Sequence, residues 1–327
     1  MSSSRLSLAL EGAVSLPEQG RIAVMGAPAG YDLSALPRDR LQVVQRFFPD
    51  HLAWARAGYD VAVNPEGEFC AALVVVPRAK AQARAMIAEA LRITDGGLVL
   101  VEGQKTDGID SLLKSLKKEV SISQVISKSH GKLAWFRGGA LSGWQAVETT
   151  LPGGFVTRPG VFSADRIDKG SEALLTVLPD DLRGHVADLG AGWGYLSRAI
   201  LERPGVTALD LVEADHDALE CARRNVSDGR ARFFWDDATT FEPRALCDAV
   251  VMNPPFHTGR SGDPELGRAF IRTAARILKP SGRLIMVANR HLPYEQELAS
   301  RFGLVEELGG TPGFKVLAAA KPRRQRR

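Results

Sequence analysis

A glycine-rich turn after an apolar run is the first place in the chain where a ligand could be held. In residues 186–197, Asp188 is followed by Gly190, Gly192 and Gly194 in the order Asp-x-Gly-x-Gly-x-Gly. Glycines let the backbone turn sharply and approach a ligand closely. The N-terminus of the helix expected beyond them offers unpaired N–H groups. The pattern therefore predicts a ligand-binding loop between a strand and a helix.

The residues around this turn argue against a dinucleotide. The dinucleotide fingerprint needs glycine at its first, third and sixth positions, and counted from Gly190 the sixth residue is Tyr195. Asp188 would repel a pyrophosphate but could pair with a cationic amino group. S-adenosylmethionine carries such a group and has no phosphate, so the loop favours this cofactor. A plain strand–turn–helix junction is the alternative, because isolated glycine motifs are weak signals.

Acidic residues follow the next two expected strands. Glu213 ends the run at residues 208–213, about 20 residues beyond the glycine loop, where a carboxylate commonly accepts the ribose hydroxyls of an adenosine. Asp236 and Asp237 follow the run at residues 232–235, where an acid or its neighbouring backbone could meet the adenine amino group. Each of the two is also consistent with a loop acid or a helix cap, and the sequence does not separate them.

The most informative stretch is Asn253-Pro254-Pro255-Phe256, after the apolar run at residues 249–252. Two prolines remove two donors and fix φ at successive residues, so the carbonyls of Asn253 and Pro254 are held in place. The Asn253 amide oxygen and a backbone carbonyl suit the two N–H donors of an exocyclic amine. Phe256 could stack on a flat ring. Such a site would align an amine nitrogen with a methyl group without a general base. A proline-rich loop with Phe256 in the core is the alternative.

Patterns for other kinds of catalysis are missing from the sequence. His257 is interpreted as a hydrogen-bonded structural residue, because a lone loop histidine usually has that role. No His/Cys/Asp cluster has metal-ligand spacing, and neither a serine-nucleophile elbow nor a Gly-x-x-x-x-Gly-Lys loop occurs. We therefore expect a site without a metal.

The elements that must position these residues alternate between strands and helices in two successive segments. In the second segment, strands are expected at residues 185–189, 208–213, 232–235, 249–252, 283–287 and 315–319. Its helices are expected at residues 195–202, 215–225, 264–278 and 293–301. The first segment shows strands at 21–25, 71–76 and 97–102 and helices at 79–93 and 111–118, before a linker at 138–154. This alternation predicts an α/β fold with ligands at the carboxyl ends of parallel strands.

Size and composition are those of a globular protein with two domains. The 327 residues, 45% of them hydrophobic and 24% charged, exclude a disordered chain, a collagen and a coiled coil. The longest strongly apolar run, at residues 69–77, is far shorter than the ~20 residues of a membrane span. No secretory signal is expected from the first residues. The three cysteines form no Cys-x-x-Cys pair, so we expect reduced thiols and a cytoplasmic location.

Positive charge is concentrated at the C-terminus. The formal net charge is +4, and residues 321–327 carry five positive charges, so the remainder of the chain is close to neutral. A short basic tail can hold phosphates through sequence-independent electrostatics. A solvated terminus is the alternative, and the tail alone leaves both open.

In combination, these motifs resemble class I S-adenosylmethionine-dependent methyltransferases. The Asn-Pro-Pro-aromatic signature at Asn253 marks the members that methylate exocyclic or amide nitrogens. The whole pattern most resembles the bacterial ribosomal RNA small subunit methyltransferase C family, the 16S rRNA guanine-N2 methyltransferases. The resemblance extends over most of the chain, because further similar stretches lie in both halves, at residues 102–109, 127–132, 159–163, 168–171, 287–294 and 313–316.

This resemblance implies two tandem Rossmann-like class I methyltransferase domains, of which only the second is active. The domain at residues 1–150 would be degenerate, with residues 25–30 in place of the cofactor loop, and would bind substrate or stabilise the enzyme. The domain at residues 151–327 would bind S-adenosylmethionine and catalyse transfer. The implied cofactor-binding residues are Asp188, Gly190, Gly192, Gly194, Glu213 and Asp237, and the implied catalytic residues are Asn253, Pro254, Pro255 and Phe256.

The resemblance also implies the substrate. We expect methylation of guanine N2 in 16S rRNA, with ribosomal RNA or the small ribosomal subunit as partner, by a monomer without membrane attachment. A related group modifies a 23S rRNA guanine with the same Asn-Pro-Pro-Phe-His sequence, and other Asn-Pro-Pro enzymes act on DNA adenine or protein glutamine. These acceptors stay open. An inactive RNA-binding assembly factor is disfavoured because Asp188, Glu213 and Asn253 are all present.

Overall fold

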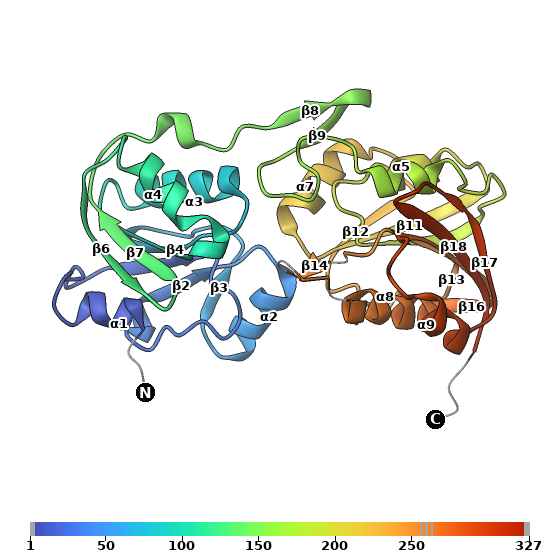
Figure 1. Ribbon diagram of the computed structural model, residues 1–327, viewed down its shortest axis with the longest axis horizontal. Helices are drawn as coiled ribbons and strands as arrows, with labels where there is room; N and C mark the ends of the chain where they lie inside the picture. The colour runs from blue at the N-terminus through green and yellow to red at the C-terminus, as the bar shows by residue number, and fades with distance from the viewer. Residues whose placement is uncertain (1–3, 256, 259–260, 263, 324–327) are drawn as a thin grey trace. The chain divides into compact units, whose positions relative to one another are not determined.

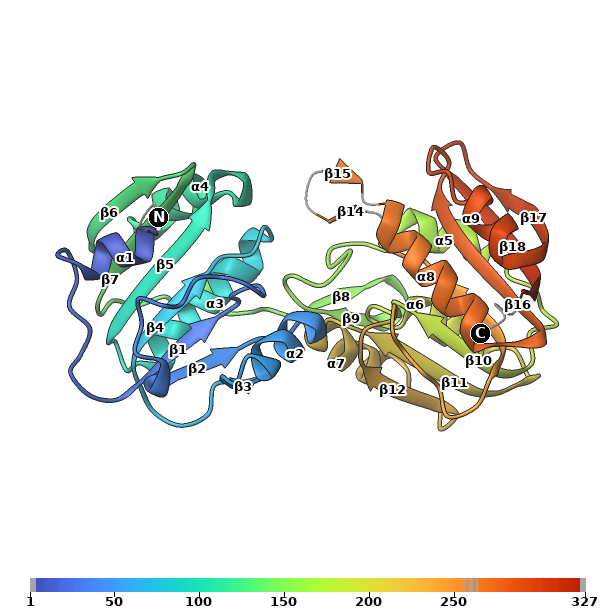
Figure 2. The ribbon, with the colours of Figure 1, turned by 90° about the horizontal axis from the view of Figure 1, so that it is seen from below.

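The chain divides into two compact units, Met1–Glu148 and Thr149–Arg327, shown in Figures 1 and 2. The computed structural model describes residues 4–255, 257–258, 261–262 and 264–323. Each unit is built on its own seven-stranded sheet. Both sheets are mixed, and helices pack against them.

In the first unit the strand order is β3-β2-β1-β4-β5-β7-β6. Neighbours from β3 to β5 pair in parallel, and β7 pairs antiparallel to both β5 and β6. The strands are β1 (Arg21–Met25), β2 (Leu41–Val44), β3 (Asp60–Ala62), β4 (Phe69–Val75), β5 (Leu98–Gln104), β6 (Ile122–Lys128) and β7 (Gly131–Phe136). The helices are α1 (Arg5–Leu10), α2 (Phe48–Arg56), α3 (Lys80–Ile93) and α4 (Ile109–Leu116), with short 3-10 turns at Arg38–Arg40, Lys105–Asp107 and Ser142–Trp144.

The second unit repeats this topology, with the strand order β12-β11-β10-β13-β16-β18-β17. Here β18 is the strand antiparallel to both of its neighbours. The strands are β10 (Gly184–Leu189), β11 (Val206–Glu213), β12 (Ala231–Trp235), β13 (Cys247–Met252), β16 (Leu278–Asn289), β17 (Phe302–Gly310) and β18 (Phe314–Pro322). The helices are α5 (Lys169–Leu175), α6 (Tyr195–Leu201), α7 (His216–Asn225), α8 (Pro264–Ile277) and α9 (Glu295–Arg301). Two hairpins, β8 (Thr149–Leu151) with β9 (Phe155–Thr157) and β14 (His257–Thr258) with β15 (Ser261–Gly262), complete the unit, with a 3-10 turn at Pro152–Gly154.

Helices cover both faces of the second sheet because its central strands are apolar on both sides. On one face Ala187 and Leu189 of β10 share a core with α8 and α9, through residues such as Phe270. On the other face Val186 shares a core with α5, α6 and α7, through residues such as Ile200. Figure 1 shows α8 and α9 on one side of this sheet and α5 and α7 on the other. Among the described residues, no helix is long and apolar enough to cross a bilayer.

The direction of the strand order reverses at β10 and β13, where parallel α/β sheets bind their ligands. The two strands pair in parallel, with Leu189 opposite Met252 at their carboxyl ends. The next residues, Gly190 and Asn253, therefore leave the sheet side by side.

Most of the expected elements are present with small shifts at their ends. Strands β2, β3, β6, β7 and β17 and helices α1, α2 and α5 were not expected from the sequence. The linker expected at residues 138–154 is partly wrong, because Thr149–Leu151 forms β8 and pairs with β9. The Thr and Gly content of residues 138–154 is typical of a loop, but the pairing of β8 with β9 makes β8 part of the second unit.

A buried amide ties the β8–β9 hairpin to the glycine loop. Asn225, at the end of α7, accepts a hydrogen bond from the Val156 N–H (2.7 Å). Its Nδ2 group donates to the Val156 carbonyl (2.9 Å) and to the Trp193 carbonyl (2.8 Å). One side chain therefore joins three backbone groups from two separate segments.

We expect Asn225→Ala to lower the free energy of unfolding of the protein by about 2–4 kcal/mol, because one buried and two partly buried backbone groups lose their partners. Urea unfolding followed by tryptophan fluorescence would measure it. Gln296→Ala, which removes an exposed amide on α9, is the matched control and should change the value little. Equal unfolding curves for the two variants would contradict the role of Asn225.

Candidate functional site

The loop after β10 keeps the three expected glycines in left-handed conformations, with φ of 74° at Gly190, 55° at Gly192 and 88° at Gly194. A Cβ atom at Gly194 would lie 2.9 Å from a methyl group of Val226, so this position has no room for a side chain. A Cβ atom at Gly192 would meet nothing within 4 Å, because this glycine borders an open pocket. The loop therefore packs closely at one end and is accessible at the other.

Asp188 lies beneath this loop rather than in the pocket. Its Oδ2 accepts a hydrogen bond from the Ser197 hydroxyl on α6 (2.6 Å), and its Oδ1 is buried without a hydrogen-bond partner among the described residues. Burial raises the pKa of this carboxyl to about 7. The structure thus places Asp188 where it fixes the start of α6 against β10, while the pocket is lined by other residues.

Glu213, at the end of β11, holds the middle of the loop. Its two oxygens accept hydrogen bonds from the backbone N–H groups of Gly192 and Asp215, each at 2.8 Å. Burial raises the pKa of the Glu213 carboxyl above its usual range. A carboxylate has about four acceptor positions, so both oxygens can still accept hydroxyl donors.

The two acids after β12 have different surroundings. Asp237 accepts hydrogen bonds from the N–H (2.8 Å) and hydroxyl (2.7 Å) of Thr239 and so closes a local turn. Asp236 accepts from the N–H of Asp237 (2.7 Å), and its own N–H donates to the Glu213 carbonyl (3.1 Å). Burial raises the pKa of Asp236. The backbone contact with Glu213 places this turn at the edge of the sheet where β11 ends, beside the glycine loop.

Asn253 directly follows β13, and its amide has a fixed orientation. Its Nδ2 group donates to Asp168 Oδ2 (2.8 Å) and to the Ser171 hydroxyl (2.9 Å). Both of its donor positions are therefore used, and its Oδ1 remains as an acceptor. Pro254 is buried and Pro255 is exposed.

Phe256 and His257 follow these prolines in the sequence. Phe256, expected to stack on a base, lies outside the described residues. Only the backbone of His257 is described, as part of β14.

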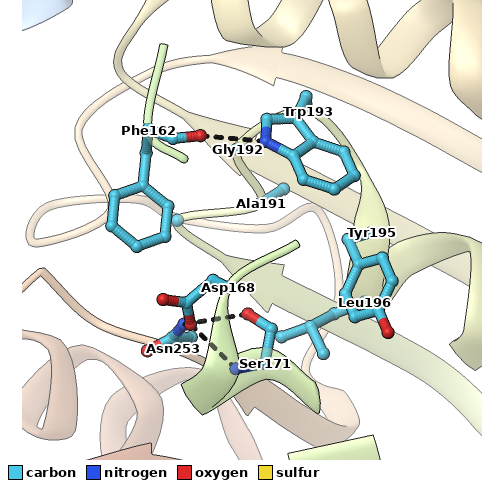
Figure 3. Close-up of a pocket in the computed structure, with 10 residues that line it drawn as sticks. Phe162, Asp168, Ser171, Ala191, Gly192, Trp193, Tyr195, Leu196 and Asn253 are labelled. Atoms are coloured by element: carbon cyan, nitrogen blue, oxygen red, sulfur yellow. Dashed lines mark hydrogen bonds between the residues drawn. The ribbon is translucent and has the colours of Figure 1, made fainter. Parts of the chain in front are cut away.

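One pocket brings the glycine loop and Asn253 together, as Figure 3 shows. Its lining residues are Phe162, Asp168, Ser171, Gly190, Ala191, Gly192, Trp193, Tyr195, Leu196 and Asn253. The carboxylate in this lining is that of Asp168, which also caps α5 by accepting from the Ser171 N–H (2.9 Å). Phe162, Asp168 and Ser171 lie in the stretches at residues 159–163 and 168–171 that carried the family resemblance, but the sequence did not indicate that they line the site.

Phe162 is the exposed aromatic residue of this lining, with 57% of its surface accessible. Its carbonyl accepts a hydrogen bond from the Trp193 indole (2.9 Å), which fastens its loop to the glycine loop. A large apolar ring left open beside polar groups suits contact with a flat ligand.

Three acids lie close together around the loop. The pKa values of Asp188, Glu213 and Asp215 are all raised, mainly by burial, and the nearby Glu213 carboxylate raises the other two further. A ligand with positive charge would relieve this repulsion. Among the described residues, no group of three or more His, Cys, Asp or Glu side chains is placed to hold a metal ion.

The first unit carries an altered version of the same loop. The strand registers place Gln45, after β2, at the position that Glu213 has after β11. They place Val75 of β4 at the position of Asn253. The first unit therefore has neither the acid nor the amide of the site.

Hydrogen bonding in the first unit has adapted to these changes. Pro28 has the position of Gly192 and has no N–H to donate. Gln45 instead donates from its amide to the Ala27 carbonyl (2.8 Å), to which the Trp54 indole also donates (2.9 Å). Trp54 is buried, so its ring fills space under the turn. The turn is thus held by side chains of the first unit itself, namely Gln45 and Trp54.

Comparisons with known proteins agree with this geometry. Residues 153–318 match the family model of the methyltransferase small domain. A protein of Hahella chejuensis named ribosomal RNA small subunit methyltransferase C is 31% identical over 233 residues, which cover 67% of this chain and 68% of that protein. The protein of the same name from Salmonella typhimurium is 30% identical over 259 residues, which cover 77% of this chain and 75% of that protein.

A solved structure matches almost the whole chain. It is that of the T. thermophilus 16S rRNA N2-guanine methyltransferase, in complex with AdoMet and guanosine. The TM-score is 0.78 at 23% identity, with 97% of this chain and 90% of that chain covered. At this identity the match shows that the two chains share the fold, including its two methyltransferase-like units.

The acid cluster leads to a prediction about stability and pH. The pKa of Asp215 is raised to about 7 by burial and by the Glu213 carboxylate. The folded state therefore holds this proton more tightly than the unfolded chain, and stability falls as pH rises from about 4 to 7. Asp215→Asn keeps a good helix cap for α7 and removes the charge. We expect it to raise the free energy of unfolding by about 1–3 kcal/mol at pH 8, and by less at pH 5.

Urea unfolding at the two pH values would measure this difference. Asp228→Asn is the matched control, because the pKa of Asp228 is lowered by its pair with Arg230, and this variant should gain no stability at pH 8. An Asp215→Asn variant that is less stable than the wild type at pH 8 would contradict the prediction.

Proposed function

Since the chain belongs to the ribosomal RNA small subunit methyltransferase C family, we propose that it transfers a methyl group from S-adenosylmethionine to N2 of a guanine in 16S rRNA. The observation that carries the proposal is the fixed amide of Asn253 beside the open Gly192 loop. The T. thermophilus structure of the same fold holds AdoMet and guanosine, the two molecules that this reaction requires.

Cofactor binding is proposed for the loop and the acids at the ends of β10, β11 and β12. Gly192 borders the pocket. Glu213, which supports the loop through the Gly192 N–H, is proposed to accept the ribose hydroxyls as well. Gly190, Gly194, Asp237 and Asp188 complete the proposed cofactor site, in which Asp188 would act from beneath the loop by fixing α6 through Ser197. S-adenosylmethionine supplies a methyl group on a positively charged sulfur, and such a ligand would favour the charged form of the acids around the loop.

Catalysis is proposed to consist of positioning. The Asn253 amide oxygen and the Pro254 carbonyl would accept the two N–H groups of the guanine amine and direct its nitrogen lone pair toward the methyl group. Pro255 keeps the backbone of this segment rigid. Phe256 is proposed to stack on the base. The substrate nucleotide must leave its helix to reach this pocket.

We propose that residues 1–150 form a degenerate methyltransferase-like domain that binds RNA or stabilises residues 151–327. Pro28 in its loop, and Gln45 and Trp54, which donate to that loop at the Ala27 carbonyl, support a role other than cofactor binding. The proposed partner is ribosomal RNA or the small ribosomal subunit, the proposed location is the cytoplasm, and the proposed state is a monomer.

One molecule of S-adenosylmethionine should bind per chain, and Glu213→Gln should weaken its binding about tenfold or more. A glutamine has one acceptor oxygen, so its amide N–H would face the N–H of Gly192 or Asp215, which opposes the loop geometry. Isothermal titration calorimetry would measure both quantities. Glu202→Gln, at an exposed glutamate after α6, is the matched control. A stoichiometry of two would contradict the packed state of the first loop.

Transfer of labelled methyl groups onto unmodified ribosomal subunits and their RNA, followed by nucleoside analysis, tests the function itself. We expect label in N2-methylguanosine of 16S rRNA. Asn253→Ala should lower the rate about 100-fold or more, because it removes the acceptor for the amine, and leave cofactor affinity nearly unchanged, because the Gly192 loop and its Glu213 support are kept. Label in 23S rRNA instead would show that the substrate is a 23S rRNA guanine and would leave the proposed mechanism unchanged. A full rate for Asn253→Ala would contradict the positioning role, and a chain that binds cofactor without labelling RNA would contradict the substrate.

A further inference from the structure

Asp168 uses only one of its two carboxylate oxygens to hold the structure. Oδ2 accepts both the Ser171 N–H (2.9 Å) and the Asn253 amide (2.8 Å). In the described part of the chain, Oδ1 has no hydrogen-bond partner. The side chain is half-buried and belongs to the lining of the pocket. Oδ1 is therefore an oriented acceptor without a structural task.

The amide oxygen of Asn253 is likewise an acceptor whose orientation is fixed and which is not used by the fold. Its two donors are used by Asp168 and Ser171, which leaves Oδ1 free to accept. In Figure 3 the carboxylate of Asp168 and the amide of Asn253 lie directly against each other, and their two remaining oxygens point away from Ser171. The two side chains thus present a pair of neighbouring acceptors.

Guanine has the complementary pair of donors. Its Watson–Crick edge carries N1–H directly beside the N2 amine, whereas adenine carries an N1 lone pair directly beside its N6 amine. A pair of acceptors would bind the first edge and repel the second. A site built to hydrogen-bond a donor discriminates strongly against a base that lacks it, because the buried acceptor is then left unpaired.

We propose that Asp168 determines the base: its Oδ1 accepts the N1–H of guanine while Asn253 Oδ1 accepts an N–H of the amine to be methylated. This inference rests on the proposed function, since it assumes that the acceptor base enters this pocket. It explains how an Asn-Pro-Pro loop, which by itself fits any exocyclic amine, selects a guanine. Asp168 also orients the Asn253 amide, so recognition and positioning depend on the same carboxylate.

The experiment compares two bases and two enzymes. Small subunits are reconstituted with 16S rRNA that carries guanine or 2-aminopurine at the methylated nucleotide. 2-Aminopurine keeps the 2-amino group but has a lone pair at N1. Asp168→Asn can keep its bonds to Ser171 and Asn253 through its one oxygen, and it then presents an N–H₂ donor in place of Oδ1. Asp165→Asn, at an exposed acid of the same loop, is the matched control.

We expect the wild type and Asp165→Asn to prefer guanine, and Asp168→Asn to lower the guanine to 2-aminopurine rate ratio about 100-fold. Cofactor affinity, measured by calorimetry, should change by less than about twofold, a small effect on this scale. The change in ratio is a readout that a merely structural role would not move, because a damaged site would slow both substrates alike.

Other outcomes overturn the inference in distinguishable ways. If Asp168→Asn slows both substrates equally, Asp168 acts only on the structure, or on the cofactor when the affinity for S-adenosylmethionine also falls. An unchanged rate on guanine would show that Asp168 does not contact the base. If the wild type binds the cofactor but does not methylate the guanine subunits, the proposed function itself fails, and this inference fails with it.

Discussion

The parallel pairing of β10 with β13 is the constraint on which the site depends. Because Leu189 lies opposite Met252, the glycine loop and Asn253 leave the sheet at adjacent points and need no long loop to bring them together. A slip of one residue would turn Asp188 away from Ser197 and exchange the faces of the whole strand. Both faces of these strands are buried under helices, so such a slip would place each side chain in the core that is packed around its neighbour.

The two units have the same topology but differ in the hydrogen bonding of the loop after their first central strand. In the second unit the Gly192 N–H requires an acceptor, and the Glu213 carboxylate supplies it. In the first unit Pro28 offers no N–H, and a carboxylate after β2 would face the Ala27 carbonyl with no proton between them. The amide of Gln45 resolves this conflict because it donates. The difference between Gly192 and Pro28 in the loop and the difference between Glu213 and Gln45 after the strand are therefore chemically linked.

The sequence was sufficient for the features that are local in the chain. Apolar runs that end in Gly190 or Asn253 indicated central strands, and the topology confirmed the α/β fold. Strands such as β2, with four residues, and β6, which is an edge strand with few buried side chains, lack a run that a pattern can detect. The placement of Asp188 beneath the loop follows from its contact with Ser197, a tertiary feature.

Asp168 could not be linked to the site from the sequence, because it precedes Asn253 by 85 residues and meets it only through the packing of α5 on β16 and β18. That contact settles the chemistry of the amide. A carboxylate can only accept, so the Asn253 amide must turn its NH₂ group toward Asp168 and its oxygen away. A flipped amide would place two acceptors against each other at 2.8 Å. The polarity of the Asn253 amide is thus set by the cap of a neighbouring helix, and its oxygen is already oriented as an acceptor before any ligand binds.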